Sequence, residues 1–296
     1  MIEKEKGKVC AVGTFDGVHR GHRSVLKVLT DCAQTYDLIP MVVTFTSHPL
    51  SLIDPRRIPL ALTPTPKKLK LLQEAGVMPE VLEFNDDLRS TPASSWMKRL
   101  AEEYNVKVLV VGYDTTFGCD GVNLSLDDYR KIGEDLGVMV ITAPEIEGVS
   151  SSAIRKAVKA GDVEKAHELL GRPYSITGKV VKGNSLGHTI GFPTANLDLP
   201  EGVAVPMTGV YSAIVKTLHD GKKYPAMVNI GTRPTVMRGN QKVLEAHLIN
   251  FSGDLYDKEI TVRFMSRLRD EQKFDSIAAL KQQLAEDKDR VMSAKE

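Results

Sequence analysis

The sequence lacks several features that would mark particular classes of protein. It has only three cysteines, Cys10, Cys32 and Cys119, which are odd in number and far apart. That set excludes a disulfide framework and a paired-cysteine metal knuckle, so we expect reduced thiols. No run approaches the roughly 20 consecutive apolar residues that a membrane-spanning helix needs. The charged stretch 1–8 does not fit a signal peptide, so we expect a cytoplasmic protein with no membrane partner.

An excess of either charge is missing too. Lysine and arginine number 39 and aspartate and glutamate 38, which gives a net charge of +1. Binding a phosphate backbone requires a clear basic excess, so we expect no nucleic-acid partner. A single nucleotide needs only a few charges and backbone amides, and this balance does not exclude one. With 296 residues, of which 42% are hydrophobic, the chain can form about two ordinary domains.

The first half of the chain alternates short apolar runs with segments of helical periodicity. The apolar runs predict strands at 9–12, 41–45, 81–84, 106–111 and 138–141. The other segments predict helices at 22–35, 66–75, 92–104, 126–136, 150–160 and 163–170. Continuous apolar strands that alternate with helices are typical of a parallel α/β sheet covered on both faces.

The pattern changes near Gly171, where polar and apolar residues begin to alternate with a period of two. Strands are predicted at 175–181, 210–217, 224–229, 243–250 and 259–264, separated by turn residues. Short strands of this kind indicate an antiparallel barrel or sandwich, and 277–288 predicts a terminal amphipathic helix. We therefore expect two domains, 1–170 and 171–296.

The segment 13–22, GTFDGVHRGH, follows the first predicted strand and opens the first predicted helix. Loops at the carboxyl ends of parallel strands bind ligands, and a helix start offers amides to an anion. His19 and His22 can donate hydrogen bonds to phosphates. The residues alone leave three readings open: a nucleotide site, a zinc pair lacking an obvious third ligand, and a turn with two solvated histidines.

A second helix start lies at 150–155, where serines precede a helical run. Serine is a favoured N-cap residue, and Ser151, Ser152 and Arg155 could contact a phosphate in the first turn. An ordinary capped helix with an exposed arginine explains the same residues.

The second half has a glycine-rich segment that ends in Pro193-Thr194-Ala195-Asn196. Its glycines permit close backbone approach to phosphates, at Gly178, Gly183, Gly187 and Gly191. Pro193 fixes the chain before Thr194 and Asn196, whose oxygens suit Mg²⁺. A barrel turn capped by these two side chains is the alternative.

Glu245 lies in the apolar segment 243–248. A carboxylate in such a strand is either a partnered structural group or a base. Phosphorylating an alcohol needs a group that takes the hydroxyl proton, and a positioned carboxylate can do so.

The segment GTFDGVHRGH resembles the signature of the bacterial bifunctional riboflavin kinase/FAD synthetases, a family of Rossmann-like α/β nucleotidyltransferase domains joined to kinase domains. Three later segments resemble this family in order: 44–49 (TFTSHP), 111–114 (VGYD, followed by Phe117-Gly118) and 150–155 (SSSAIR). For 1–170 the resemblance implies FMN adenylylation, with His19, His22 and Arg155 as catalytic residues. The implied ATP ligands are Gly13, Thr14, Phe15, Asp16, Gly17, Gly21, Asp114, Ser151 and Ser152.

The second half is similar to the riboflavin kinase domain of the same family. The matching segments are 191–196 (GFPTAN), 209–211 (GVY), 229–235 (NIGTRPT), 245–248 (EAHL) and Leu268-Arg269 with Phe274. This similarity implies a six-stranded barrel, Mg²⁺ on Thr194 and Asn196, and Glu245 as the base. It further implies ATP at the four glycines and Pro193, and flavin at Asn229 and Arg269.

Together the resemblances imply that ATP phosphorylates riboflavin to FMN and then adenylylates FMN to FAD, releasing pyrophosphate. The sequence departs from the family at Thr115 and Thr116, where an aromatic and a basic residue are usual, and at His188, which replaces an arginine. These departures motivate an alternative, a riboflavin kinase whose first domain is a weak or inactive adenylyltransferase. Two further alternatives are a transferase for another phosphorylated alcohol and a non-catalytic flavin sensor.

Overall fold

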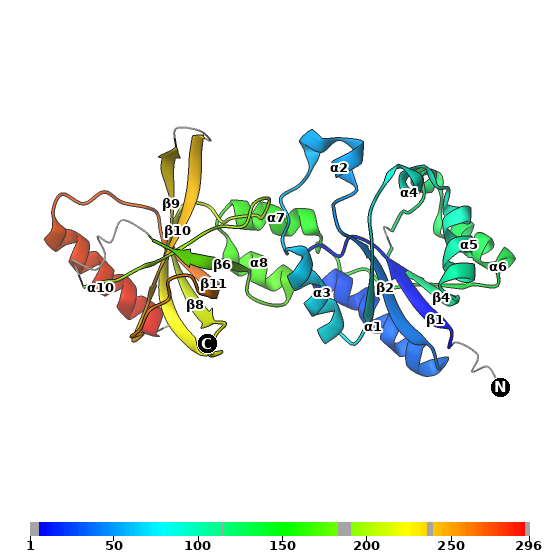
Figure 1. Ribbon diagram of the computed structural model, residues 1–296, viewed down its shortest axis with the longest axis horizontal. Coiled ribbons are helices and arrows are strands. Elements are labelled where there is room, and N and C mark those ends of the chain that lie inside the picture. Colours follow the sequence, from blue (N-terminus) through cyan, green and yellow to red (C-terminus); the bar gives the residue numbers. More distant parts are fainter. Residues whose placement is uncertain (1–5, 114, 183–190, 236–238, 294–296) are drawn as a thin grey trace. The chain divides into compact units, whose positions relative to one another are not determined.

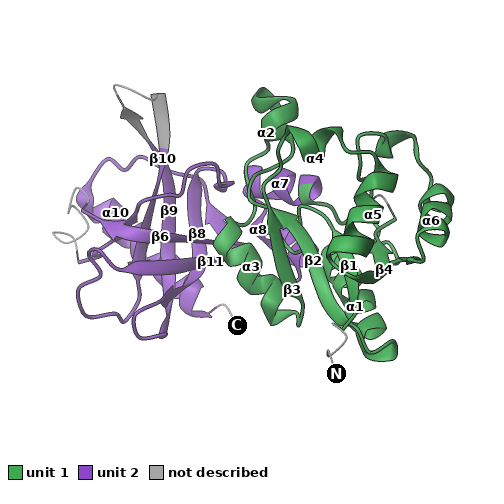
Figure 2. Cartoon of the chain, turned by 45° about the vertical axis from the view of Figure 1, so that its right-hand side comes forward, with its two compact units in different colours: residues 1–151 green, residues 152–296 purple. Residues whose placement is uncertain are grey.

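The computed structural model describes residues 6–113, 115–182, 191–235 and 239–293 (Figure 1). The chain divides into two compact units, residues 1–151 and 152–296 (Figure 2). Helix α8 (Val163–Leu170) and all but the first residue of α7 (Ser151–Lys159) therefore belong to the second unit. The expected boundary at 170/171 separates the residues that carry the two activities, which is a different property from compactness. It stays a prediction.

The first unit is built on a five-stranded parallel sheet, as expected. Its strands are β1 (Lys8–Val12), β2 (Ile39–Phe45), β3 (Met78–Leu82), β4 (Val106–Val111) and β5 (Met139–Thr142). They lie in the order β3-β2-β1-β4-β5, and every neighbouring pair is parallel. The order reverses between β1 and β4, which is where open α/β sheets bind ligands beyond the carboxyl ends of the strands.

Helices cover both faces of this sheet, which explains why its strands read as continuous apolar runs. On one face α1 (Arg20–Thr35) and α3 (Thr65–Glu74) pack on Val9 and Ala11. On the other, α5 (Ala93–Glu103) and α6 (Leu126–Asp135) pack on Cys10. The short elements α2 (Leu50–Ile53), η1 (Pro55–Arg57), α4 (Asp86–Ser90) and η2 (Gly121–Asn123) were not predicted.

The second unit contains a closed antiparallel barrel, which confirms that expectation and excludes an open sandwich. Its strands are β6 (Ser175–Val181), β7 (Ala195–Leu197), β8 (Gly209–Thr217), β9 (Lys223–Thr235), β10 (Gly239–Leu248) and β11 (Glu259–Arg269). They close in the order β10-β7-β6-β11-β8-β9. Leu244, Ala246 and Leu248 are buried, as period-two alternation predicts for a barrel interior.

The terminal helix α10 (Ile277–Ser293) is also confirmed. Its Leu284 and Val291 pack in a cluster with Met227, Ile249 and Leu268. Because these residues lie outside the helix, α10 is held by tertiary packing rather than by helix propensity alone. Among the described residues, no helix combines the length and the apolar character that a bilayer crossing requires.

Candidate active sites

The loop between β1 and α1 lies at the reversal point of the parallel sheet and has an unusual backbone. Phe15, Gly17 and Val18 have positive φ angles of 49°, 91° and 40°. For Phe15 and Val18 this conformation costs of the order of 1–3 kcal/mol each, and it persists only when surrounding structure holds it. Both side chains are buried in the core beneath α1, so packing supplies part of that support.

Two predicted catalytic residues, His19 and His22, meet at the start of α1. His19 is the N-cap, and its Nδ1 accepts a hydrogen bond from the His22 backbone N–H at 3.3 Å. In the neutral ring the proton therefore lies on Nε2. The two imidazoles stack, with centroids 3.6 Å apart. A Cβ on Gly21 would lie 3.2 Å from the His19 ring, so this glycine makes room for the stacked pair.

Asp16 and Ser151 support the loop from within the protein. The buried Asp16 carboxylate accepts hydrogen bonds from the Leu62 and Thr63 backbone N–H groups at 3.0 Å. The Ser151 hydroxyl donates to the Asp16 backbone carbonyl at 2.8 Å. Both residues were predicted to bind ATP, and these contacts show how they hold the loop. Their contact with ATP stays a prediction.

Sequence reasoning missed Lys68 on α3, which is buried next to the same loop. Its ammonium donates to the Thr14 carbonyl at 3.1 Å, and to the Thr44 hydroxyl and the Phe45 carbonyl at 3.0 Å each. Burial lowers the pKa of Lys68, and the negative charge of Asp16 acts in the opposite direction. The sequence held one indication that Lys68 is buried. Lys68 precedes the apolar Leu72 by four residues, so the two share a face of the helix.

The remaining predicted residues of the first site are placed as follows. Gly13 and Thr14 directly follow β1. Ser152 and Arg155 follow Ser151 along α7 and belong to the second compact unit. Asp114 lies outside the described residues. Thr115, one of the two threonines at which the sequence departs from the family pattern, accepts a hydrogen bond from the Gly112 backbone N–H at 2.8 Å. This bond closes a local turn.

In the barrel, strand register brings three predicted residues together. Glu245 on β10 lies directly opposite Asn196 on β7 and Asn229 on β9. Directly opposite side chains share a face and have Cβ atoms about 5 Å apart. Because Leu244 and Ala246 are buried inside the barrel, the three polar side chains share its outer face. Segments far apart in the sequence therefore form one polar cluster.

The proposed metal segment is fastened to β10 on both sides of Thr194. His247 Nδ1 donates to the Pro193 carbonyl at 2.8 Å, and β7 pairs with β10 from Ala195 onward. Burial lowers the pKa of His247, while the hydrogen bond to Pro193 raises it to a smaller extent. His247 was not predicted to have this role, and it fixes the chain just before the two oxygen-bearing side chains.

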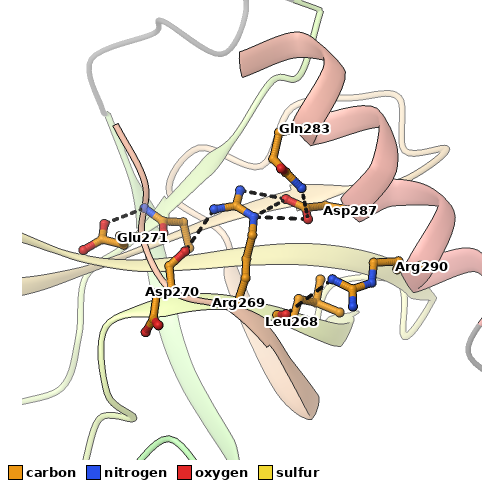
Figure 3. A network of polar contacts seen from close by, with 8 residues as sticks. Leu268, Arg269, Asp270, Glu271, Gln283, Asp287 and Arg290 are labelled. Carbon is orange, nitrogen blue, oxygen red and sulfur yellow. Dashed lines mark hydrogen bonds and ion pairs between the residues drawn. The ribbon is translucent and has the colours of Figure 1, made fainter. Parts of the chain in front are cut away.

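Arg269, a predicted flavin ligand, makes a buried ion pair with Asp287 of α10 (Figure 3). Its Nη2 and Nε lie 2.7 and 3.0 Å from Asp287 Oδ2, and its Nη1 donates to the Asp270 carbonyl at 3.0 Å. Gln283 also donates to Asp287, at 3.1 Å. The guanidinium thus ties β11 to the terminal helix.

The neighbouring Glu271 reaches the other predicted flavin residue, Asn229. Asn229 Nδ2 donates to Glu271 Oε1 at 3.4 Å. A Cβ on Gly231 would lie 2.8 Å from that same carboxylate oxygen, so the glycine leaves room for Glu271. The loop after β11 therefore contacts the polar cluster around Glu245 through Asn229.

The glycines predicted to bind ATP in this unit fall into different settings. In β6, a Cβ on Gly178 would lie 2.4 Å from the Asp198 carbonyl, so this glycine is required by strand packing. Gly191 has φ +85° and open space around its Cα, as in a turn. Gly183 and Gly187, with His188, lie outside the described residues. No group of three or more metal-binding histidine, cysteine, aspartate or glutamate side chains occurs in the part of the chain that the structure describes.

Comparison with known proteins gives matches to two family models, which cover different parts of the chain. A family model described as FAD synthetase matches residues 1–155, and one described as riboflavin kinase matches residues 170–294. The match over 1–155 leaves the kinase-only alternative without support.

Three relatives share the name bifunctional riboflavin kinase/FMN adenylyltransferase. The Pseudomonas fluorescens protein is 39% identical over 94% of this chain and 90% of its own length. The Escherichia coli K12 protein is 38% identical over 96% and 91%, and the Bacillus subtilis protein 35% identical over 97% and 93%.

The fold matches a crystal structure described as a macrolide-efflux protein from Streptococcus pneumoniae. The TM-score is 0.90 at 31% identity, over 99% of this chain and 96% of that one. The family models and the three relatives cover both compact units, in the order that the sequence motifs implied. The chain therefore belongs to the bifunctional riboflavin kinase/FMN adenylyltransferase family.

Proposed function

We propose that this enzyme divides its two reactions between its two halves. Residues 1–170 transfer AMP from ATP to FMN, and residues 171–296 transfer a phosphoryl group from ATP to riboflavin. The matches at 1–155 and 170–294 support this assignment. The reactions are then consecutive: the barrel makes the FMN that the other half consumes, and FAD and pyrophosphate leave.

The observation that carries the adenylylation proposal is the stacked His19–His22 pair at the start of α1, beside the reversal point of the sheet. FMN already carries an anionic phosphate, so attack on the α-phosphate of ATP needs no strong base. The site must instead hold two anions together and stabilise the charge of the departing pyrophosphate. The His19–His22 pair and the backbone N–H groups of the helix start suit that task. The catalytic role that the family resemblance implies for Arg155 stays a prediction.

The polar cluster around Glu245 supports the kinase proposal. The 5′-hydroxyl of riboflavin must lose a proton as it attacks the γ-phosphate, and Glu245 takes it as general base. Asn196 lies opposite Glu245, and Thr194 directly precedes β7. We propose Mg²⁺ as the divalent cation, because hydroxyl and amide oxygens are hard ligands that suit it. When bound, Mg²⁺ neutralises charge on the ATP phosphates.

The flavin is assigned to the neighbouring surface that includes Asn229 and Arg269. All three guanidinium nitrogens of Arg269 are bonded within the protein. Its contribution is therefore to fix the wall of the site through Asp287 and Asp270, and Asn229 contacts the flavin directly.

The test is a product assay with the full chain, riboflavin, ATP and Mg²⁺, with chromatography that separates FMN from FAD. A Glu245→Gln variant should lose about 10²–10⁴-fold of FMN formation, the usual effect of removing a general base. It should still convert added FMN to FAD. Replacing His19 and His22 by asparagine should give the opposite pattern.

Glu259→Gln is the matched control, because it removes an exposed carboxylate from another strand of the same barrel. Equal loss of both products in a folded Glu245→Gln protein contradicts the separate sites. A wild-type protein that makes FMN but no FAD from FMN contradicts the adenylylation proposal and supports the kinase-only alternative.

A further inference from the structure

The buried Lys68 ammonium has a complete set of partners inside the first unit. Its three N–H groups match three acceptors at 3.0–3.1 Å: the Thr14 carbonyl, the Thr44 hydroxyl and the Phe45 carbonyl. Only 6% of the residue is exposed. An ammonium has three donors and no acceptor, so Lys68 could bind a phosphate only by giving up one of these bonds. Its place in the structure is that of a support and not of an anion ligand.

The three acceptors lie where β1 and β2 end. Thr14 comes two residues after β1, whereas Thr44 and Phe45 are the last residues of β2. The Thr44 hydroxyl also donates to the Thr14 carbonyl at 3.2 Å, so two donors converge on that one oxygen. Lys68 therefore clamps the carboxyl ends of two neighbouring strands at a single point.

The clamped carbonyl belongs to the residue that immediately precedes the strained turn. Phe15 follows Thr14 with φ 49°, and the turn leads through Val18 to His19. The Asp16 side chain and Ser151 hold the next part of the loop through their own hydrogen bonds. Without Lys68, the Thr14 carbonyl would keep only the hydrogen bond from the Thr44 hydroxyl, at 3.2 Å, among the side-chain contacts of the described residues. A rotation of that peptide would change the direction in which the chain enters the turn that leads to both histidines.

We propose that Lys68 is a positioning residue for AMP transfer, which acts by fixing the Thr14 carbonyl and thereby the course of the loop that carries His19 and His22. This inference rests on the proposed adenylylation site. It assigns Lys68 an effect on the rate of the chemical step and little effect on nucleotide affinity, because the ammonium is turned toward backbone carbonyls.

The experiment compares Lys68→Met with Lys70→Met in the full chain. Lys70 is exposed on the same helix, so its variant controls for the loss of one positive charge. With FMN, ATP and Mg²⁺, Lys68→Met should lower kcat for FAD formation by about 10-fold to 100-fold and change the KM for ATP by less than about 3-fold. FMN formation by the barrel should stay within about 2-fold of wild type, since the kinase site lies in the other unit.

Two further variants separate positioning from simple loss of structure. Lys68→Arg keeps the cation and should recover part of kcat, which a hydrophobic filler cannot do. Thr44→Val removes one link of the clamp, keeps the shape of the side chain, and should lower kcat in the same direction by a smaller factor. If Lys68→Met does not fold, as judged by circular dichroism, Thr44→Val carries the test.

The inference is overturned by unchanged kcat in folded Lys68→Met, or by unchanged kcat in Thr44→Val where Lys68→Met does not fold. A rise in the KM for ATP at constant kcat also overturns it, because that result identifies Lys68 as a nucleotide ligand. If wild-type protein makes no FAD from FMN, the proposed function fails, and not the role of Lys68 within it.

Discussion

The buried ion pair between Arg269 and Asp287 predicts a large, local loss of stability when its carboxylate is removed (Figure 3). The Asp287 side chain has no exposed surface, and 12% of the Arg269 side chain is exposed. In Asp287→Ala the arginine keeps its charge and loses its counterion, while Gln283 loses an acceptor. The helix α10 then loses its ion pair with β11 and keeps the longer hydrogen bond from Arg290 to the Leu268 carbonyl, at 3.4 Å.

The size of the effect follows from this burial. Removing one member of a buried ion pair costs about 3–5 kcal/mol, because the other charge stays buried without compensation. Water can reach part of Arg269, so we expect the lower end, about 3 kcal/mol. With a urea dependence of about 2 kcal/mol/M for a unit of this size, the unfolding midpoint of the second unit should fall by roughly 1.5 M.

Hydrogen exchange followed by mass spectrometry, along a urea series, measures the unfolding midpoint for peptides from α10 and β11 separately from peptides of the first unit. Asp287→Asn should lose less stability, since it keeps an acceptor for Arg269. Glu286→Ala is the control, because it removes an exposed carboxylate that is bonded to Gln282 on the same helix. Equal exchange in Asp287→Ala and Glu286→Ala would refute the reasoning.

Three further outcomes follow from single positions. Gly118→Ala places a Cβ 2.3 Å from a backbone nitrogen at φ +86°, whereas Gly137→Ala at φ +67° meets no atom within 4 Å. Thermal unfolding should therefore show the larger loss of stability, above about 1–3 kcal/mol, for Gly118→Ala. Equal melting temperatures of the two variants would contradict this. Burial raises the pKa of Cys10 to about 12, so a thiol reagent at about pH 8 should label the exposed Cys119 and spare Cys10 until the protein unfolds, as mass spectrometry would show. Burial lowers the pKa of His247 below 6.5. The unfolded chain therefore binds the imidazole proton more readily than the folded chain does. The stability that the neutral His247 side chain contributes is complete above about pH 6.5 and is lost as the pH falls toward the folded-state pKa. His247→Gln should flatten that dependence in denaturation curves, and an unchanged pH profile would exclude it.

The elements that the sequence predicted well are those whose pattern comes from burial along the whole element. Strands β1, β2, β4 and β5 read as apolar runs because helices cover both faces of the sheet. The edge strand β3 spans Met78–Leu82 and not the predicted 81–84, because Pro79 and Glu80 interrupt its apolar pattern. By contrast, β7 has three residues, too few for any periodicity to appear. Strand β11 continues beyond its predicted end at 264 to Arg269, because irregularities near Ser266 and Arg267 break the alternation while pairing with β8 continues.

For the sites, the sequence named Glu245, Asn196 and Asn229 but could not show that they face one another. That fact depends on the register of three strands, which forms only when the barrel closes. Lys68 and Asp287 were missed because charged residues are expected at the surface. Each is buried because its partners come from other elements, and only the fold supplies those partners.

Strand β7 both closes the barrel and carries a predicted Mg²⁺ ligand. Its three residues pair with Leu244–Ala246 on β10 and with Val180 and Val181 on β6, and they include Asn196. If β7 detached, both neighbours would present unpaired backbone groups, the kind of strand edge that recruits other chains into aggregates. Substitutions that detach β7 should therefore abolish riboflavin phosphorylation and promote aggregation together. An inactive variant of this kind would precipitate and would not bind riboflavin in solution.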